Sequence, residues 1–314
     1  MNQRLSERDV TNRVNVESAQ QVRDAITAIF TARYPGADLS LFARVFDDID
    51  ALFHGRMPGY LSCDTPYHDL RHTLDVTLAF ARVIDGHDRV HAEVDRLGLR
   101  RAMLGVVIAL LHDSGYVRRV SEADVENGAV FTKVHVGRSA EFIADYLPKI
   151  GFGEDVQVAQ RIVHFTGYEL KLEDIQLDEP KDRLLGTMIG TADLIGQMSD
   201  RTYLEKVRDF LYEELVWGEI AREKTAAGEI VRYASPEDLV SKTPEFFEFA
   251  RDRVVNKLGG AHRYAGAHFD GENPYLRAID GNLTFLRDAL RDGDLARLRR
   301  ICRSLSLRDE PQTK

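Results

Sequence analysis

Residues 103–115 read MLGVVIALLHDSG, and this stretch decides what kind of fold the chain can form. An apolar run without a charged residue predicts a buried segment, and its length favours a helix over a strand. The run ends in His112 and Asp113. A carboxylate buried without a partner is costly, so a hydrogen-bond network or a cation is expected close to Asp113. Other parts of the chain must supply that partner.

Apolar residues recur at helical spacing on both sides of this stretch, whereas the alternation typical of strands is hard to find. Ser235, Pro236 and two following acids predict another helix start, because serine caps a helix and proline fits its first turn. We expect further helices from there to about residue 305, and a short extended piece around 230–233. The predicted fold class is all-α. The other expected helices cover residues 16–32, 38–53, 68–84, 97–111, 136–147, 155–165, 181–198 and 203–222.

The domain organisation follows from where this helical pattern starts and stops. Residues 1–15 are polar and lack an apolar face, so they are expected to form a flexible N-terminal arm. No low-complexity linker and no internal repeat interrupts the rest of the chain. We therefore expect a single helical domain over residues 16–308, in which the C-terminal helices occupy about 235–308.

The composition is that of an ordinary globular protein with a sizeable core, because 44% of its 314 residues are hydrophobic. A formal net charge of −9 argues against binding to a nucleic-acid duplex, since such binding needs a basic face. No apolar run approaches the roughly 20 residues that span a bilayer, and no signal-peptide pattern opens the chain. With two cysteines and no CxxC motif, a cytoplasmic protein without membrane contact is expected.

Two histidines stand close together in residues 65–76, which read TPYHDLRHTLDV. His68 and His72 are four residues apart and would project from the same face of the expected helix. Such a pair can share one cleft. Taken alone, a pair at this spacing is more often a pair of surface histidines, so further donors are needed to indicate a site.

Further nitrogen and oxygen donors follow along the chain. His135 stands at the start of an expected helix, and His164 lies in the sequence RIVHFTGY. Each has an alternative explanation, because His135 can be a surface residue and His164 a hydrogen-bonded core histidine. Together with His112 and Asp113, they form a set of donors whose types suit a divalent metal ion.

The helix expected over 181–198 carries an unusual stripe. Gly186, Gly190, Asp193 and Gln197 fall on one face, with small residues followed by polar ones. Small residues let a helix approach a crowded centre, whereas an acid and an amide on a buried face need partners inside it. The stripe therefore predicts that Asp193 is a ligand, and its alternative is a local cap.

The order of these residues, with ALLHDSG at its centre, resembles the HD-domain metal-dependent phosphohydrolase superfamily. The resemblance spans about residues 60–215, the metal-binding block, and implies an HD-type helical bundle around a buried metal centre. It also implies a dinuclear centre in which one carboxylate bridges the two ions. The first ion would be held by His72, His112, Asp113 and Asp193, and the second by the bridging Asp113 with His135 and His164.

The stretch YHDLRH is similar to the Tyr-His-Asn-x-x-His stretch of cyclic-nucleotide phosphodiesterases. That resemblance implies that His68 protonates the leaving sugar oxygen while His72 binds metal. The chain departs from this family in two places. Asp69 replaces the asparagine, and Tyr116 stands where the family usually has a histidine four residues after His112.

The mechanism that the resemblance implies is hydrolysis of a phosphate ester by metal-activated water. Two divalent ions, of Mn, Fe, Zn or Mg, would activate the water and neutralise the phosphate oxygens. His68 would give a proton to the leaving group, kept charged by Asp69 or another carboxylate. Gln197 would contact the substrate or the water. Catalytic roles are therefore predicted for His68, Asp113 and Gln197.

The implied substrate is a phosphorylated small molecule, and most narrowly a cyclic nucleotide or a related nucleotide. Phe246 and Phe247 are candidates for stacking on a base and are equally well explained as core residues. A homodimer is compatible with the sequence without being indicated by it.

Two other functions stay open. The same ligand order resembles HD-fold diiron oxygenases, which use iron and dioxygen instead of water. A spare histidine such as His68 beside a ligand favours hydrolysis, because it can act as an acid. The second alternative is a nucleotide-binding module without catalysis, and the presence of every expected donor type argues against it.

Overall fold

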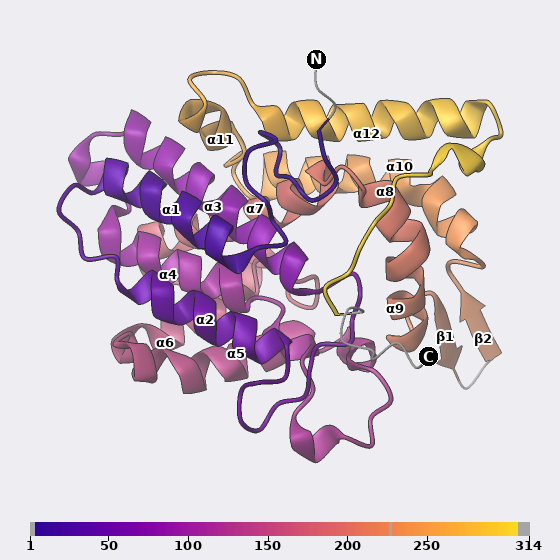
Figure 1. Cartoon of the computed structure of the whole chain (residues 1–314), viewed down its shortest axis with the longest axis horizontal. Coiled ribbons are helices and arrows are strands. Elements are labelled where there is room, and N and C mark those ends of the chain that lie inside the picture. Colours follow the sequence, from indigo (N-terminus) through magenta and orange to yellow (C-terminus); the bar gives the residue numbers. More distant parts are fainter. Residues whose placement is uncertain (1–3, 226–227, 307–314) are drawn as a thin grey trace.

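A long helix, α3 (Leu70–Val90), forms the centre of the computed structural model, which describes residues 4–225 and 228–306. Its side chains from Leu70 to Asp88 are buried without interruption, as expected for a helix enclosed on all sides. Figure 1 shows the helices that surround it. They are α1 (Ala19–Arg33), α4 (Gly98–Leu111), α7 (Pro180–Ser199) and α11 (Arg263–His268).

The remaining elements complete an all-α fold, which confirms the predicted fold class. Turns of π-helix, Val207–Leu211 and Arg253–Lys257, follow α8 and α10. Within the described residues the strands form one antiparallel hairpin, in which β1 (Arg222–Thr225) pairs with β2 (Gly228–Val231). The other helices are α2 (Leu41–Phe53), α5 (His135–Tyr146), α6 (Val156–Val163), α8 (Tyr203–Lys206), α9 (Tyr212–Trp217), α10 (Pro236–Asp252) and α12 (Pro274–Arg291).

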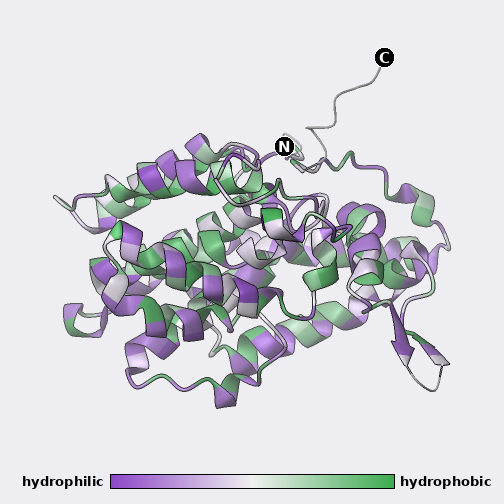
Figure 2. Ribbon diagram, turned by 90° about the horizontal axis from the view of Figure 1, so that it is seen from below, coloured by the Kyte–Doolittle hydropathy of each residue, from purple (hydrophilic) through white to green (hydrophobic). Residues whose placement is uncertain are grey.

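One cluster of buried apolar residues, from Val16 to Leu305, joins these helices. Figure 2 shows hydrophobic and hydrophilic residues alternating along the outer helices, the pattern of amphipathic helices that cover a core. The hairpin stands away from this helical body. Within the described residues, none of the helices combines the length and the apolar character that a membrane span requires.

The N-terminal residues differ from the flexible arm that their composition predicts. Asp9 is buried, pairs with Arg82 of α3 and accepts two backbone hydrogen bonds of 2.9 Å. The carbonyl of Ser6 accepts a hydrogen bond of 2.6 Å from Arg71, which is also on α3. Two buried arginines need acceptors, a requirement that the apolar pattern of the arm does not reveal. The prediction is corrected: the described part of this segment is packed on the core.

The C-terminal half departs from the sequence prediction in two places. The extended piece expected around 230–233 is the second strand of the hairpin, β2, which ends at Val231. Helices were expected to about residue 305, but α12 ends at Arg291 and residues 298–306 form an irregular segment. Backbone N–H groups of this segment donate hydrogen bonds to side chains of other elements, instead of to carbonyls of a helix.

The start of α3 corrects the predicted geometry of the histidine pair. Asp69 is the N-cap of α3, and its Oδ1 accepts a hydrogen bond of 3.1 Å from the backbone N–H of His72. Aspartate is a preferred cap, so the helix begins after His68. His68 and His72 therefore do not share a helical face. Their rings meet edge to face with centroids 5.7 Å apart.

Two glycines allow close backbone contacts around the predicted ligands. A Cβ at Gly115 would lie 1.9 Å from the backbone oxygen of His135, so only glycine lets α5 start against the turn after α4. A Cβ at Gly190 would lie 2.4 Å from the backbone oxygen of Phe165, the residue after His164. The expectation that small residues of α7 permit a crowded approach is confirmed.

Candidate metal centre

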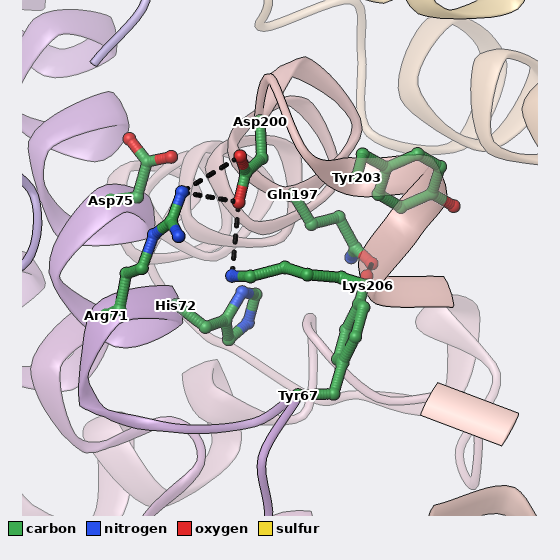
Figure 3. Close-up of a pocket in the computed structure, with 8 residues that line it drawn as sticks. All are labelled: Tyr67, Arg71, His72, Asp75, Gln197, Asp200, Tyr203 and Lys206. Atoms are coloured by element: carbon green, nitrogen blue, oxygen red, sulfur yellow. Dashed lines mark hydrogen bonds and ion pairs between the residues drawn. The ribbon is translucent and has the colours of Figure 1, made fainter. Parts of the chain in front are cut away.

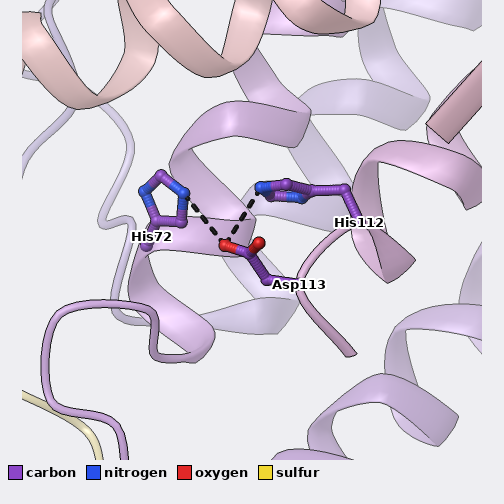
Figure 4. Close-up of side chains that lie close together, drawn as sticks. All are labelled: His72, His112 and Asp113. Carbon is purple, nitrogen blue, oxygen red and sulfur yellow. Dashed lines mark ion pairs between the residues drawn. The ribbon is translucent and has the colours of Figure 1, made fainter. Parts of the chain in front are cut away.

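Three of the predicted ligands converge where the start of α3 meets the end of α4 (Figure 4). His72, His112 and Asp113 are buried and offer ligand atoms within 4.8 Å of one another. Asp113 Oδ2 lies 3.3 Å from His72 Nε2 and 3.1 Å from His112 Nε2. Even so, neither His112 Nε2 nor Asp113 Oδ2 has a well-aligned hydrogen-bond partner among the described residues. These atoms face a common space that a cation would fill.

The backbone fixes which ring nitrogen two of the histidines present. His112 Nδ1 donates to the carbonyl of Ala109 at 2.8 Å, and His135 Nδ1 donates to the carbonyl of Thr132 at 2.7 Å. Because a carbonyl only accepts, the proton of each neutral ring is on Nδ1. Nε2 of both rings then carries a free electron pair that can bind a metal ion, and it lies close to Asp113. A hydrogen bond of this kind orients histidine ligands in metal sites.

Asp193 approaches the same space from α7. Its Oδ1 lies 3.5 Å from His72 Nε2 and 3.9 Å from His112 Nε2, as the small-residue stripe predicts. Gln197 donates a hydrogen bond of 3.3 Å to Asp193 Oδ1 and accepts one of 3.1 Å from the Tyr67 hydroxyl. The Gln197 amide therefore connects the Tyr67 hydroxyl with Asp193.

The electrostatics of this cluster favour positive charge. Burial opposes protonation of His72, but Asp113 and Asp193 together raise the pKa of His72 to about 10. Burial likewise opposes ionisation of Asp113, yet His112 and His72 hold the pKa of Asp113 well below its usual range. Without a metal ion, a proton on a histidine balances the two acids. A divalent cation bound to the neutral histidines would do the same.

His135 and His68 lie on the other side of Asp113 and share one aromatic neighbour. His135 Nε2 is 3.6 Å from Asp113 Oδ1, the oxygen that does not face His72. Tyr116 stacks on His135 with centroids 4.4 Å apart and on His68 with centroids 4.6 Å apart. The tyrosine that replaces the expected histidine is thus a packing residue between the two rings.

Glu214 of α9 is the carboxylate that pairs with His68. His68 Nδ1 donates to Glu214 Oε2 at 2.5 Å, and Oε1 accepts a hydrogen bond of 2.6 Å from the backbone N–H of Tyr67. Glu214 is 2% exposed at its side chain, whereas that of His68 is 19% exposed. Asp69, the predicted partner of His68, instead caps α3. The pairing is therefore with a residue from a distant helix.

His164 pairs with an acid of its own segment. It follows α6, and its Nδ1 donates to Glu169 Oε1 at 2.6 Å. In the part of the chain that the structure describes, it forms no ion pair with Asp113. Arg253 donates to the carbonyls of Phe165 and Gly167 and so fixes the segment between His164 and Glu169.

A comparison with protein families places these residues in one known group. A family model described as Npun_R2479-like matches residues 54–264. The chain belongs to the Npun_R2479-like family. No curated protein and no solved structure matches it. The matched range contains every predicted ligand of this Npun_R2479-like chain and also Glu169, Glu214 and Arg253.

His72 also lines a small pocket of this Npun_R2479-like chain, together with Arg71, Asp200 and Lys206 (Figure 3). Asp200 forms two ion pairs in this pocket, one of 3.0 Å with Arg71 and one of 3.1 Å with Lys206. Both cations of the pocket are thereby paired with a carboxylate. Asp200 therefore joins α3 to α8 at this pocket through Arg71 and Lys206.

Sequence reasoning missed Glu214 and Glu169, and only Glu214 left a signal. Leu204, Val207 and Leu211 form an apolar stripe, and Glu214 occupies the next position of that stripe. An acid on a core-facing stripe needs a buried partner. Glu169 lies in an irregular segment, where no periodicity distinguishes it.

The two phenylalanines considered for base stacking pack against the hydrophobic core. Phe247 is buried in the core and meets Tyr203 edge to face, with centroids 5.5 Å apart. Phe246 is partly buried against the same core. Phe247 is thus a core residue.

Proposed function

We propose that this Npun_R2479-like chain is a metal-dependent phosphohydrolase, and most narrowly a phosphodiesterase. The observation that carries the proposal is the convergence of His72, His112 and Asp113 on one buried space. Two of the atoms that face this space, His112 Nε2 and Asp113 Oδ2, have no well-aligned hydrogen-bond partner among residues 4–225 and 228–306. Buried polar atoms without partners are rare and costly, and a divalent cation would satisfy both.

The donor types fit a divalent ion. His72, His112, Asp113 and Asp193 would hold the first ion, because imidazole and carboxylate suit Mn, Fe and Zn and the carboxylates also suit Mg. Asp113 Oδ1 and His135 would contribute to a second, with His164 oriented by Glu169. When bound, such ions would activate water and neutralise the oxygens of a phosphate ester.

The other residues of the site would handle the leaving group and keep the ligands in place. With Nδ1 of His68 engaged by Glu214, Nε2 is the nitrogen left to give a proton to the leaving oxygen. A buried carboxylate beside the ring stabilises the imidazolium needed for this step. Gln197 would hold Asp193 in its ligand orientation through the amide that Tyr67 fixes.

The substrate would be a phosphorylated small molecule, and the narrower choice of a cyclic or related nucleotide rests on the YHDLRH resemblance. A cytoplasmic location is part of the same proposal. It is supported by two cysteines that are free, one of them buried, which is compatible with a reducing compartment.

The test is hydrolysis by the purified full chain after removal of metals and reloading with Mn²⁺, Zn²⁺, Fe²⁺ or Mg²⁺ in turn. Bis(4-nitrophenyl) phosphate, a 3′,5′-cyclic nucleotide and a 2′,3′-cyclic nucleotide are the substrates. We expect metal-dependent release of product that is lost in His112→Ala. A protein that hydrolyses no phosphate ester with any of these ions would contradict the proposal.

The diiron oxygenase remains the rival enzyme function. The His68–Glu214 pair favours hydrolysis, because a histidine that a carboxylate orients beside the ligands can serve a leaving group, and an oxygenase has less need of it. Dioxygen consumption that requires iron, measured without phosphate release, would select the oxygenase. Nucleotide binding without turnover or dioxygen use would instead select the binding module.

A further inference from the structure

The C-terminal segment, residues 298–306, is bound to the residue that caps the metal-carrying helix. Asp69 Oδ2 accepts hydrogen bonds of 3.0 Å from the Ser304 hydroxyl and 2.7 Å from the backbone N–H of Leu305. These residues are 235 and 236 positions away in the chain. Figure 1 shows the segment running back from the end of α12 past α8. The contact therefore connects the last described residues with the start of α3.

One carboxylate serves two elements at this point. Asp69 Oδ1 accepts from the backbone N–H of His72, which is a predicted ligand, while Oδ2 accepts from the C-terminal segment. Asp69 is completely buried, so water does not replace either set of donors. Because the two oxygens belong to one rigid group, the segment fixes the orientation with which Asp69 caps His72.

A second connection reaches His68. The Ser306 hydroxyl donates to the carbonyl of Thr65 at 3.3 Å, and the Thr65 hydroxyl donates to the carbonyl of His68 at 3.0 Å. The Ser304 and Ser306 hydroxyls also lie 2.7 Å apart. The segment thus contacts the backbone before His68, at Thr65, and the side chain of Asp69, which lies between His68 and His72.

The rest of the segment is held independently of Asp69. Leu298 and Leu305 are buried, and the carbonyl of Leu298 accepts a hydrogen bond of 2.9 Å from Arg208. The backbone N–H of Arg300 donates to Glu205 of α8 at 3.1 Å. Between these anchors Arg299 and Arg303 are exposed. Release of Ser304 and Leu305 from Asp69 would therefore make the chain around Arg299 and Arg303 more accessible, while the helices stay folded.

We propose that residues 298–306 are a latch that completes the candidate site, with Asp69 as the positioning residue through which docking of the latch sets His72 and His68. This inference rests on the proposed function, since it assigns the latch an effect on metal affinity. Supporting contacts one step behind metal ligands commonly change metal affinity about 10- to 100-fold. Docking of the latch and binding of the ion should also favour each other reciprocally.

The test uses Asp69→Asn in the full chain. Asparagine keeps an oxygen that can cap His72, but its NH₂ group cannot accept from Ser304 and Leu305. Latch docking is measured as the rate of trypsin cleavage after Arg299 and Arg303, identified by mass, and metal affinity by Mn²⁺ titration. We expect faster cleavage and roughly 10-fold weaker Mn²⁺ binding. Mn²⁺ should slow the cleavage in the wild type.

Two further variants keep the test decisive. Ser304→Ala leaves the Asp69 cap intact and should change both readouts in the same direction by less, so it serves if Asp69→Asn does not fold. Ser18→Ala removes the cap of α1, which accepts from Gln21, and should leave Mn²⁺ affinity unchanged.

The outcomes separate the latch from the proposed function. Faster cleavage with unchanged Mn²⁺ affinity would show that the segment only covers the surface and would overturn the latch. Unchanged cleavage in Asp69→Asn would show that Asp69 is not the anchor and would overturn it equally. If the wild type binds no divalent ion, the proposed function fails first and the latch fails with it.

Discussion

At the scale of single residues, the pair formed by His68 and Glu214 is the proposed source of the leaving-group proton. We expect His68→Ala to retain its metal ions and to lose about 10²- to 10⁴-fold in rate on an ester with a poor leaving group, the usual range for general acid catalysis. Nitrophenyl esters should lose less, because their leaving group departs with little help from a proton. Glu214→Gln should follow the same pattern more weakly. Equal losses on both esters, or loss of metal, would remove the acid assignment.

Tyr116 gives a second prediction at this scale. Its buried ring stacks on His68 and His135, and each aromatic contact contributes about 0.5–1.5 kcal/mol beyond burial. Tyr116→Leu should therefore lower the free energy of unfolding by about 1–3 kcal/mol and slow turnover by loosening both histidines. Tyr116→Phe keeps the stacking and is the matched control. Denaturant unfolding and hydrolysis rates measure the two effects, and equal behaviour of the two variants would contradict the stacking role.

At the scale of elements, α7 and the segment after α6 meet through a glycine. In Gly190→Ala the new Cβ would press on the carbonyl of Phe165, a backbone atom that cannot move without shifting His164. Overpacking of this kind costs typically about 1–3 kcal/mol. We expect lower thermal stability and selective loss of the second ion. Gly281→Ala on the exposed face of α12 meets nothing within 4 Å and should be neutral or stabilising. Normal metal content in Gly190→Ala would contradict this arrangement.

The sequence predicted the elements better than their ends. Helical spacing located α3, α4 and α7, because their apolar residues face a core over many turns. It placed the start of α3 at His68, whereas Asp69 caps the helix and the helix begins at Leu70. Residues 298–306 escaped prediction for a similar reason. Their partners, Asp69 and Glu205, are distant in the chain, and no local pattern records a contact with them.

In the candidate site too, residues with a local sequence pattern were predicted, and partners from distant parts of the chain were not. Apolar context and small-residue spacing indicated His112, Asp113 and Asp193, and the structure brings all three towards His72. The partner of His68 was missed, although an acid on the apolar stripe of α8 and α9 marked it. For such residues, buried charge is a stronger signal than sequence proximity.

At the scale of the whole molecule, the N-terminal segment is bound to α3 by a buried ion pair. Burial raises the pKa of Asp9, but the ion pair with Arg82 and the hydrogen bonds lower it by more. The pKa therefore lies below the ordinary 3.8. A carboxylate whose pKa is lowered by folding stabilises the folded state above its unfolded pKa. This stabilisation is lost as the pH falls below about 4.

Asp9→Asn leaves the buried charge of Arg82 without its counter-ion. We expect the free energy of unfolding at pH 7 to fall by about 3–5 kcal/mol. The difference from the wild type should begin to shrink as the pH falls below about 4, because the ionised carboxylate then stabilises the folded wild type less. Asp24→Asn, which breaks an exposed pair with Arg23, should stay within about 0.5 kcal/mol. A difference that does not vary with pH would contradict the ionised Asp9.

The most direct test of the central claim is the number of ions bound per chain in Asp113→Ala, measured by elemental analysis after loading with Mn²⁺ and removal of free ion. We expect the wild type to bind two ions and to melt at a higher temperature when loaded, because an ion that binds the folded state alone stabilises it. His164→Ala should lose one ion, and His54→Ala, outside the site, should lose none. Asp113→Ala should lose both. A variant that keeps the full wild-type complement would contradict the account, because Asp113 would then hold no metal.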